Sequence, residues 1–304
     1  MKKSAQIHKA LTIFAYTVML TGMTLLLAVV FRYPQNHLIP QRMIPGVGIC
    51  VIALLAAGAN KIYSLIGKRT PLYLLALVIF GVLLYITALS RQGNENTLLD
   101  YTYVYRDAMN LATGGTLEYT DYFVTYSNNL KPMLLLSVWF RVAVLLGISP
   151  FHFVLLRNVL LVLLVVWACG YLTEQKGDCR WRFPILLTFA FLLPMWDMVS
   201  VFYTDSMSFG LGILTLALLK KAGSTKTNKG KILWSVLAGV TTILAIIWKI
   251  TAIIPLIAGA MILLWQREKA DRRVLMQYAA AAIVFGVGLQ LWANTYDVTR
   301  KAAV

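Results

Sequence analysis

Tyrosine, asparagine, aspartate and threonine side chains gather in one polar segment, residues 91–131, which lies between long apolar runs. These side chains hydrogen-bond to polar cyclic substrates, and the tyrosine rings can also stack against them. The same tyrosines would suit an aromatic belt at a membrane–water interface. The segment is therefore the first place where we expect chemistry, either as a binding surface or as an interfacial belt.

Ionisable residues inside apolar runs form a second group of candidates. A charged group at membrane depth costs about 2.5–3.5 kcal/mol on insertion, so each one calls for an explanation. The group consists of Arg141, Arg157, Asp197, Asp205 and Lys249.

Each of these residues has a structural and a functional interpretation. Lys249 interrupts the run AIIWKITAIIPL, where it either reaches the interface from a helix junction or binds the anionic head group of a lipid. Arg141 and Arg157 either form interhelical ion pairs, extend their charged heads to the interface, or bind the same kind of ligand. Asp205 precedes the helix start SMSFGLG, where a carboxylate accepts backbone N–H bonds as an N-cap. Asp197 has a similar juxtamembrane position.

The composition defines the elements that must position these residues. Of 304 residues, 59% are hydrophobic and 13% are charged, and the mean hydropathy is +0.72. Soluble domains are about 45–50% apolar and about 25% charged, so a soluble enzyme, a disordered chain and a disulfide scaffold are excluded. The net charge of +16 lies mainly in short loops, where it sets orientation and meets anionic lipids. We therefore expect membrane lipids, and no nucleic acid, as partners.

Apolar runs long enough to cross a membrane recur along the whole chain. A spanning helix needs about 20 apolar residues, and the runs predict an all-α polytopic integral membrane protein with about nine or ten transmembrane helices. The eight clear candidates are 10–31, 44–60, 71–90, 151–172, 183–203, 232–248, 250–265 and 274–293, and two shorter runs are 132–147 and 206–219. We expect one transmembrane domain over 1–304, in which 1–70 holds an uncleaved first span and a second one.

The loop charges predict the orientation of these spans. Basic residues concentrate in the N-terminus and in loops 61–69, 220–231 and 267–273, which are therefore expected to be cytoplasmic. Residues 91–131 carry more acidic than basic groups and are expected to be external. An odd number of crossings must separate segment 91–131 from loop 220–231, yet four apolar runs lie between them. One of the four runs therefore does not cross the membrane as a regular helix, and the loop charges indicate that it lies in the region 131–172.

A short amphipathic helix is expected inside the external segment. Apolar and aromatic residues recur at helical spacing from Tyr101 to Leu111, and Gly114-Gly115 then ends the helix. Such a helix could lie on the bilayer surface. Asp100 would serve as its N-cap, and Asp107 is expected on a solvated face beside Arg106.

The order of these features resembles the GT-C superfamily of polytopic glycosyltransferases, which includes the protein O-mannosyltransferases and the lipid A aminoarabinose transferase. The pattern is D-x(3)-Y-x(2)-A-x(2)-L-x(2)-G, an acidic and aromatic stretch, and a polar segment before the next helix. The matching residues are Asp100, Tyr105 (one position off), Ala108, Leu111, Gly114, Asp121-Tyr122-Phe123 and Tyr126-Ser127-Asn128-Asn129-Leu130-Lys131-Pro132. Further on, Arg157, Tyr203-x-Asp205 and Lys249-Ile250-Thr251 are similar to polar positions of the family.

The resemblance implies sugar transfer from a polyprenyl-phosphate donor to a cell-envelope glycan, lipid or protein on the external face of the cell membrane. It assigns the general base to Asp100 and the lipid phosphate to Lys131 and Lys249. The other substrate-binding positions that it implies are Asp121, Tyr122, Tyr126, Asn128, Asn129, Arg157 and Asp205. We expect no tightly bound cofactor, because the sequence has no D-x-D and no histidine cluster, although a divalent cation could assist the donor phosphate.

Two other functions fit the same composition. A transporter or flippase of lipid-linked intermediates would place Arg141, Arg157 and Lys249 along a path through the helices. A non-catalytic or truncated membrane subunit would fit the end of the chain at NTYDVTRKAAV, because members of the superfamily continue beyond this point.

Overall fold

The computed structural model of the chain describes residues 70–90, 99–174, 178–191, 204–254 and 272–295, with isolated positions between 54 and 61 and at 199, 256, 257 and 259. The chain divides into two compact units, Met1–Gly58 and Ala59–Val304. All the elements below belong to the second unit. The predicted span 10–31 and nearly all of 44–60 lie outside the described residues.

The described part of the chain is all-α, as expected for this membrane protein. Its elements, in chain order, are α3 (Thr70–Ser90), α4 (Leu99–Ala112), α5 (Thr120–Thr125), η3 (Ser127–Asn129), α6 (Leu130–Leu145), α7 (Pro150–Thr173), α8 (Arg182–Phe191), α10 (Thr204–Ser224), α11 (Asn228–Trp248), η4 (Ile250–Ala252) and α13 (Arg272–Asn294). Four helices among the described residues are long and apolar enough to span a membrane: Pro71–Ser90, Pro150–Thr173, Asn228–Trp248 and Val274–Asn294. They coincide with four of the predicted runs.

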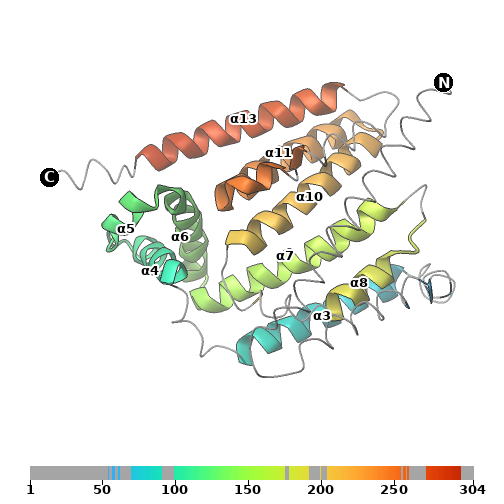
Figure 1. Cartoon of the computed structure of the whole chain (residues 1–304), viewed down its shortest axis with the longest axis horizontal. Coiled ribbons are helices and arrows are strands. Elements are labelled where there is room, and N and C mark those ends of the chain that lie inside the picture. The colour runs from blue at the N-terminus through green and yellow to red at the C-terminus, as the bar shows by residue number, and fades with distance from the viewer. Residues whose placement is uncertain are drawn as a thin grey trace, which may run out of the picture. The chain divides into compact units, whose positions relative to one another are not determined.

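The long helices form a bundle around α7. One apolar core joins α7 to α3 and α8 through residues such as Leu84, Val159 and Leu186. On its other side α7 packs against α10, α10 pairs with α11, and α11 packs against α13 (Figure 1). Leucine, isoleucine and valine side chains on the outer faces of α3 and α13 are exposed, as suits helices that meet lipid. We call α3, α7, α8, α10, α11 and α13 the bundle.

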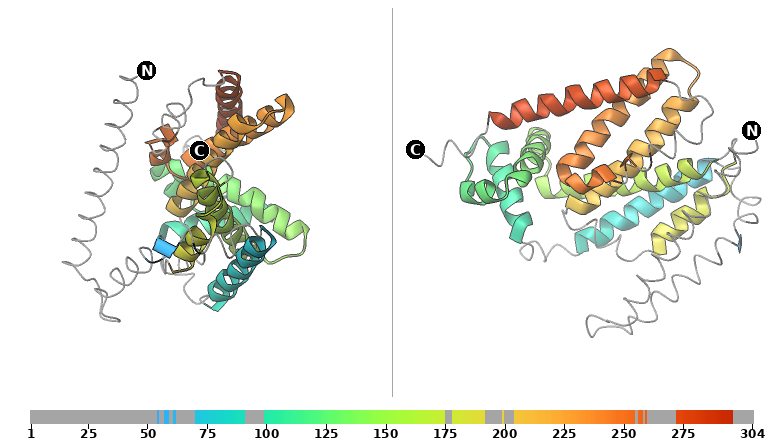
Figure 2. Two further views of the ribbon diagram at one scale, coloured as in Figure 1. Left: turned by 90° about the vertical axis from the view of Figure 1, so that its right-hand side faces the viewer. Right: turned by 45° about the horizontal axis from the view of Figure 1, so that its top comes forward.

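A smaller set of helices caps one end of the bundle. We call residues Leu99–Leu145, which contain α4, α5, η3 and α6, the cap. Its core includes Ala108 and Phe140 and continues into Val154 of α7, Met207 of α10 and Trp248 of α11. The cap therefore rests on the first turns of α7 and α10 and on the last turn of α11. Figure 2 shows the cap on the same side of the bundle in a second view.

Lys220 lies at the end of the bundle that is opposite the cap. Lys220, near the end of α10, donates hydrogen bonds from Nζ to the carbonyl oxygens of Tyr171, Leu172 and Glu174 at the end of α7, over 2.7, 3.0 and 2.6 Å. These carbonyls lie at the carboxyl end of α7, where no further turn follows to supply N–H donors, so the ammonium group helps to satisfy them; the Tyr171 carbonyl also accepts the N–H of Glu174 over 3.2 Å. The carboxyl ends of α7 and α10 thus lie together, and the lysine-rich loop that follows is at the far end from the cap.

Helix α6 differs from the long helices in its length and direction. It has 16 residues, packs mainly against α4, and lies across the direction of the long helices (Figure 1). Within the region 131–172, where we predicted one irregular run, residues 151–172 form part of the regular long helix α7, and α6 is a shorter helix that covers the run 132–147. The number of membrane crossings in this region stays a prediction.

The amphipathic helix predicted within residues 91–131 is confirmed as α4, and its apolar face packs against protein. Val104, Ala108 and Ala112 of α4 are buried, four residues apart, and this stripe packs against α6. Tyr105 contacts Phe140 edge to face, with ring centroids 4.9 Å apart. The stripe is therefore covered by protein.

Gly114 ends α4 in the predicted way. Its φ is +87°, in the left-handed region, and the N–H of Gly115 reaches back to the Asn110 carbonyl over 2.8 Å. The N–H of Gly114 bonds to the Leu111 carbonyl over 3.3 Å, which completes a Schellman motif. This turn sends the chain back along α4, so that residues 117–126 lie beside it.

Candidate functional site

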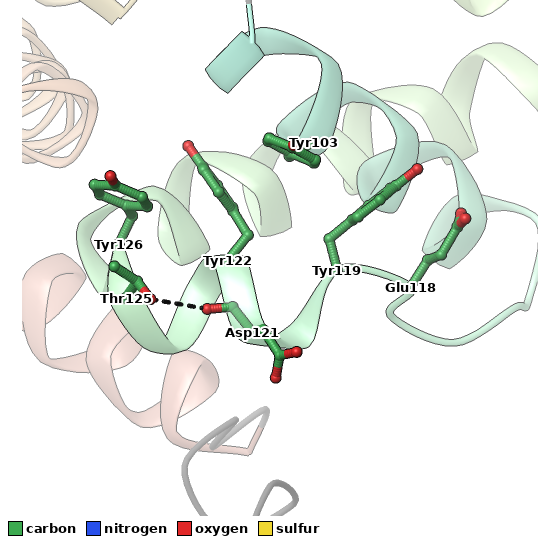
Figure 3. A pocket seen from close by; sticks show the side chains of 7 residues that line it. All are labelled: Tyr103, Glu118, Tyr119, Asp121, Tyr122, Thr125 and Tyr126. Atoms are coloured by element: carbon green, nitrogen blue, oxygen red, sulfur yellow. Dashed lines mark hydrogen bonds between the residues drawn. The ribbon is translucent and has the colours of Figure 1, made fainter.

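A pocket of about 550 Å³ lies in the cap, between α4 and the returning chain. Its walls are tyrosine rings, two carboxylates and a threonine: Tyr103, Glu118, Tyr119, Asp121, Tyr122, Thr125 and Tyr126. Figure 3 shows the four tyrosines in a row, with Glu118 at one end of it. Three of the predicted substrate-binding residues, Asp121, Tyr122 and Tyr126, are thus brought together.

The tyrosine rings support one another. The centroid of Tyr103 lies 4.9 Å from that of Tyr119 and 4.7 Å from that of Tyr122. Tyr126 continues the row at 5.1 Å from Tyr122 and is 50% exposed. Such contacts contribute about 0.5–1.5 kcal/mol each beyond their buried area, so the row is pre-formed. It offers aromatic faces and edges to a ligand that comes from solvent.

Asp107 holds the returning chain against α4. Its carboxylate accepts the backbone N–H of Glu118 over 2.8 Å and that of Tyr119 over 3.0 Å. The side chain is 0% exposed, so the expectation of a solvated face beside Arg106 is wrong. The reason is that Asp107 continues the buried stripe of α4, where the returning chain covers it. Burial raises the pKa of Asp107, and the two N–H bonds oppose this rise.

Two asparagines extend the site toward α6. Asn129 donates from Nδ2 to the Tyr122 hydroxyl over 2.6 Å, and Asn128 donates to the Asn129 side-chain oxygen over 3.1 Å. Both predicted positions are therefore linked to the tyrosine row. Lys131 is half-buried in the first turn of α6, next along the chain, but it does not line the pocket.

Asp100 and Asp205 are described by their backbone positions alone. Asp100 lies in the first turn of α4, seven residues before Asp107, so the two are nearly on one face of the helix. Asp205 lies in the first turn of α10. The helices already include Leu99 and Thr204, so Asp100 and Asp205 lie inside the first turns and the prediction that they are N-caps is wrong. Asp197 lies outside the described residues.

The predicted cations lie near the junction of cap and bundle. Lys249 follows the last residue of α11 in an extended conformation and separates it from η4, so the predicted helix junction is confirmed. The guanidinium of Arg157, which is half-buried, lies 5.9 Å from the ring centroid of Trp248. Arg141 donates to the Leu111 carbonyl at the end of α4 over 3.1 Å. That contact is a helix cap and differs from the expected ion pair.

Sequence reasoning missed four of the residues that line the pocket, Tyr103, Glu118, Tyr119 and Thr125, and the role of Asp107 in holding its wall. A signal for part of this set exists in the spacing of Tyr119, Tyr122 and Tyr126, which places three rings on one side of a short helix. Tyr103 and Asp107 belong to α4, and no local sequence pattern pairs α4 with this short helix.

A metal site would need a cluster of ligands. Among the described residues, no three histidine, cysteine, aspartate or glutamate side chains come close enough to hold an ion. A divalent cation that assists the donor phosphate stays a prediction.

Comparison with known proteins gives no match to a family model, a curated protein or a solved structure. The resemblance to the GT-C superfamily therefore stays a hypothesis, and the function has to be argued from the site.

Proposed function

We propose that the protein is a membrane glycosyltransferase that moves a sugar from a polyprenyl-phosphate donor to a cell-envelope acceptor. The observation that carries this proposal is the tyrosine pocket, which opens in a helical cap at one end of membrane-spanning helices. Tyrosine faces with hydroxyl and amide groups beside them suit the faces and edges of a sugar ring. The proposal places the cap on the external face of the cell membrane and the N-terminus in the cytoplasm.

The reaction needs a base and a stabilised leaving group. In an inverting transfer, a carboxylate removes the proton of the acceptor hydroxyl as that oxygen bonds to the anomeric carbon, and the lipid phosphate leaves with the electron pair. We assign the base to Asp100, at the start of the helix that carries Tyr103. Fixed cations near the phosphate stabilise the charge that develops on it, and we assign this role to Lys131, Arg157 and Lys249.

The positions of the cations support an enzyme over a transporter. Lys249 and Arg157 are both close to Trp248, which belongs to the core that joins cap and bundle. Arg141 bonds to the end of α4 in the cap itself. A transport path would need cations spread along the helices, whereas these three gather toward one end. Asp205, in the first turn of α10, belongs to this end as well.

Transfer of radiolabelled sugars from a panel of polyprenyl-phosphate donors tests the proposal. Membranes that contain the wild type should transfer label to an envelope fraction, and Asp100→Asn should abolish this transfer at unchanged expression. Asp178→Asn is the control, because it removes one carboxylate at the end of the bundle away from the cap. Transfer by Asp100→Asn at the wild-type rate would refute the role of the base. Absence of transfer from every donor by folded wild type would favour a non-catalytic subunit.

Donor binding tests the cations separately. Lys249→Ala should weaken binding of the polyprenyl-phosphate sugar, because the phosphate loses a charged partner, and should leave acceptor binding unchanged. Equal donor affinity in the variant and the wild type would show that Lys249 does not bind the phosphate and only extends to the interface from a helix junction.

A further inference from the structure

The pocket has an unusual charge for this protein. The chain carries 28 lysines and arginines against 12 aspartates and glutamates, yet the residues that line the pocket include Glu118 and Asp121 and no basic side chain. The carboxylates point to different sides of the tyrosine row, that of Glu118 beside Tyr119 and that of Asp121 away from the hydroxyl groups (Figure 3). Both side chains are exposed to solvent.

The nearest described cation acts outside the pocket. Arg106 donates from Nη1 to the Tyr119 hydroxyl over 3.0 Å and is itself exposed. It fixes the outer edge of one ring and does not line the cavity. Glu118 accepts a long hydrogen bond of 3.4 Å from Asn110 and also interacts electrostatically with Arg106, which offsets part of its charge from outside the cavity.

Aromatic faces add to the attraction that carboxylates exert on a cation. Each tyrosine ring carries negative charge density on its faces, and a cation within about 6 Å of a ring centroid is attracted to it. Four rings, each with the centroid of a neighbouring ring within 5.1 Å of its own, form the wall between the two carboxylates. A ligand with an anionic group, such as a lipid phosphate, would meet two like charges here.

We propose that the tyrosine pocket binds the acceptor, and that this acceptor is a saccharide with protonated amino groups. The sugar ring stacks along Tyr103, Tyr122 and Tyr126, and the ammonium groups face Glu118 and Asp121. The assignment as acceptor rests on the proposed glycosyltransferase function, whereas the binding preference stands on the pocket alone. The phosphate of the donor is thereby excluded from the pocket and left to the cations at the junction of cap and bundle.

Two tetrasaccharides with the same ring and linkage test the preference. The full chain, in nanodiscs of uncharged lipid at pH 6, is titrated with the glucosamine tetramer and with its fully N-acetylated counterpart, and empty nanodiscs serve as the blank. The cationic tetramer should bind about tenfold tighter, because two carboxylates and the ring faces favour the charged form. Its affinity should fall as salt is raised, and that of the neutral tetramer should not.

Variants locate the effect in the pocket. The double change Glu118→Gln and Asp121→Asn should bring the cationic tetramer to within about twofold of the neutral one, and Tyr126→Ala should weaken both. Asp178→Asn removes a carboxylate elsewhere and should change neither affinity. Equal affinities for the two tetramers in the wild type, or a preference that survives the double change, would overturn the inference.

The two proposals fail in different ways. If the wild type transfers sugar to a neutral or anionic acceptor and does not prefer the cationic tetramer, the inference about the acceptor is wrong and the enzymatic function stands. If the cationic tetramer binds in the pocket but receives sugar from no donor, the binding preference stands and the glycosyltransferase assignment fails.

Discussion

Asp107 holds the wall of the pocket through two backbone hydrogen bonds, to the N–H groups of Glu118 and Tyr119. An asparagine in its place has one acceptor oxygen and would leave one of these N–H groups facing an amide NH₂. A hydrogen bond to a charged group contributes about 1.5–3 kcal/mol, so Asp107→Asn should speed exchange of one of the two amides by roughly 10- to 100-fold. Hydrogen exchange measured by mass spectrometry over peptide 115–126 checks this. Unchanged exchange there would show that the loop is held by its tyrosine contacts alone.

The same carboxylate makes stability depend on pH. Burial raises the pKa of Asp107 above that of an unfolded aspartate, so the folded state binds the proton more tightly. The stability that this group contributes is fully present below the ordinary carboxyl range and is lost as pH rises through the raised pKa. Asp107→Asn lacks this contribution. The melting temperature of the wild type minus that of the variant should therefore fall as pH rises from 4 to 8, and a constant difference would contradict the assignment.

Among the elements, the end of α4 depends on a backbone conformation. At Gly114 a Cβ atom would meet nothing within 4 Å, and φ is +87°. Substitution there is therefore opposed by the conformation alone, which costs an L-residue about 1–2 kcal/mol. Gly114→Ala should lower the melting temperature, and Gly114→Asn should lower it less. Gly288→Ala is the matched control, because it also meets open space but lies inside α13, where alanine favours the helix. A loss of the same size at both glycines would contradict this explanation.

Helices α11 and α13 approach each other closely at Gly239. A Cβ atom at this position would lie 2.8 Å from the Ala282 amide nitrogen and 2.9 Å from the Tyr278 carbonyl oxygen. Backbone atoms cannot rotate away, so Gly239→Ala must separate the two helices and should destabilise the bundle by about 1–3 kcal/mol. Gly286→Ala, in the same interface, would meet the end of the Ile243 side chain at 3.4 Å and should be tolerated. Thermal unfolding of the purified variants compares them, and equal melting temperatures would show that the helices adjust freely.

The long elements could be predicted from the sequence, because a run of about 20 apolar residues has one stable form in a bilayer. The runs 71–90, 151–172, 232–248 and 274–293 confirm this. Run 132–147 is also apolar, but its contacts with α4 determine where it lies. The sequence indicates only whether the number of membrane crossings between two loops is odd or even. The length of α10 could not be predicted either, because the helix runs from Thr204 to Ser224 and its polar ends extend beyond the apolar run 206–219.

The sequence predicts which segment holds the candidate site, but it does not predict which side chains of that segment contact one another. The composition of residues 91–131 correctly indicates where tyrosines and carboxylates gather, and three predicted residues line the pocket. The contact of Tyr103 with Tyr119 and Tyr122 depends on the turn at Gly114, which brings residues 16–19 positions apart together. The buried state of Asp107 has the same origin. Local periodicity places it beside Arg106 on the helix and cannot show what covers it.

At the scale of the whole molecule, the cap and the bundle share one apolar core. Val104 and Phe123 of the cap pack in the same cluster as Leu211 of α10 and Ala293 of α13. The cap therefore has no closed core of its own, and the pocket keeps its shape only while the ends of the long helices stay together. This dependence ties the proposed acceptor site to the membrane surface, where a lipid-linked donor would arrive.

The arrangement of the ends predicts which side of the membrane each loop faces. Helices α7 and α10 begin at the cap, and their carboxyl ends meet at Lys220, next to the lysine-rich loop, so the cap and this loop should lie on opposite sides. In a variant without Cys50, Cys169 and Cys179, Thr116→Cys should react with a membrane-impermeant maleimide in intact cells, because the basic loop is retained inside. Lys226→Cys, which is exposed in the wild type, should react only after permeabilisation. Labelling of both from the same side would mean that α6 crosses the membrane, and the cap would then have to open during insertion.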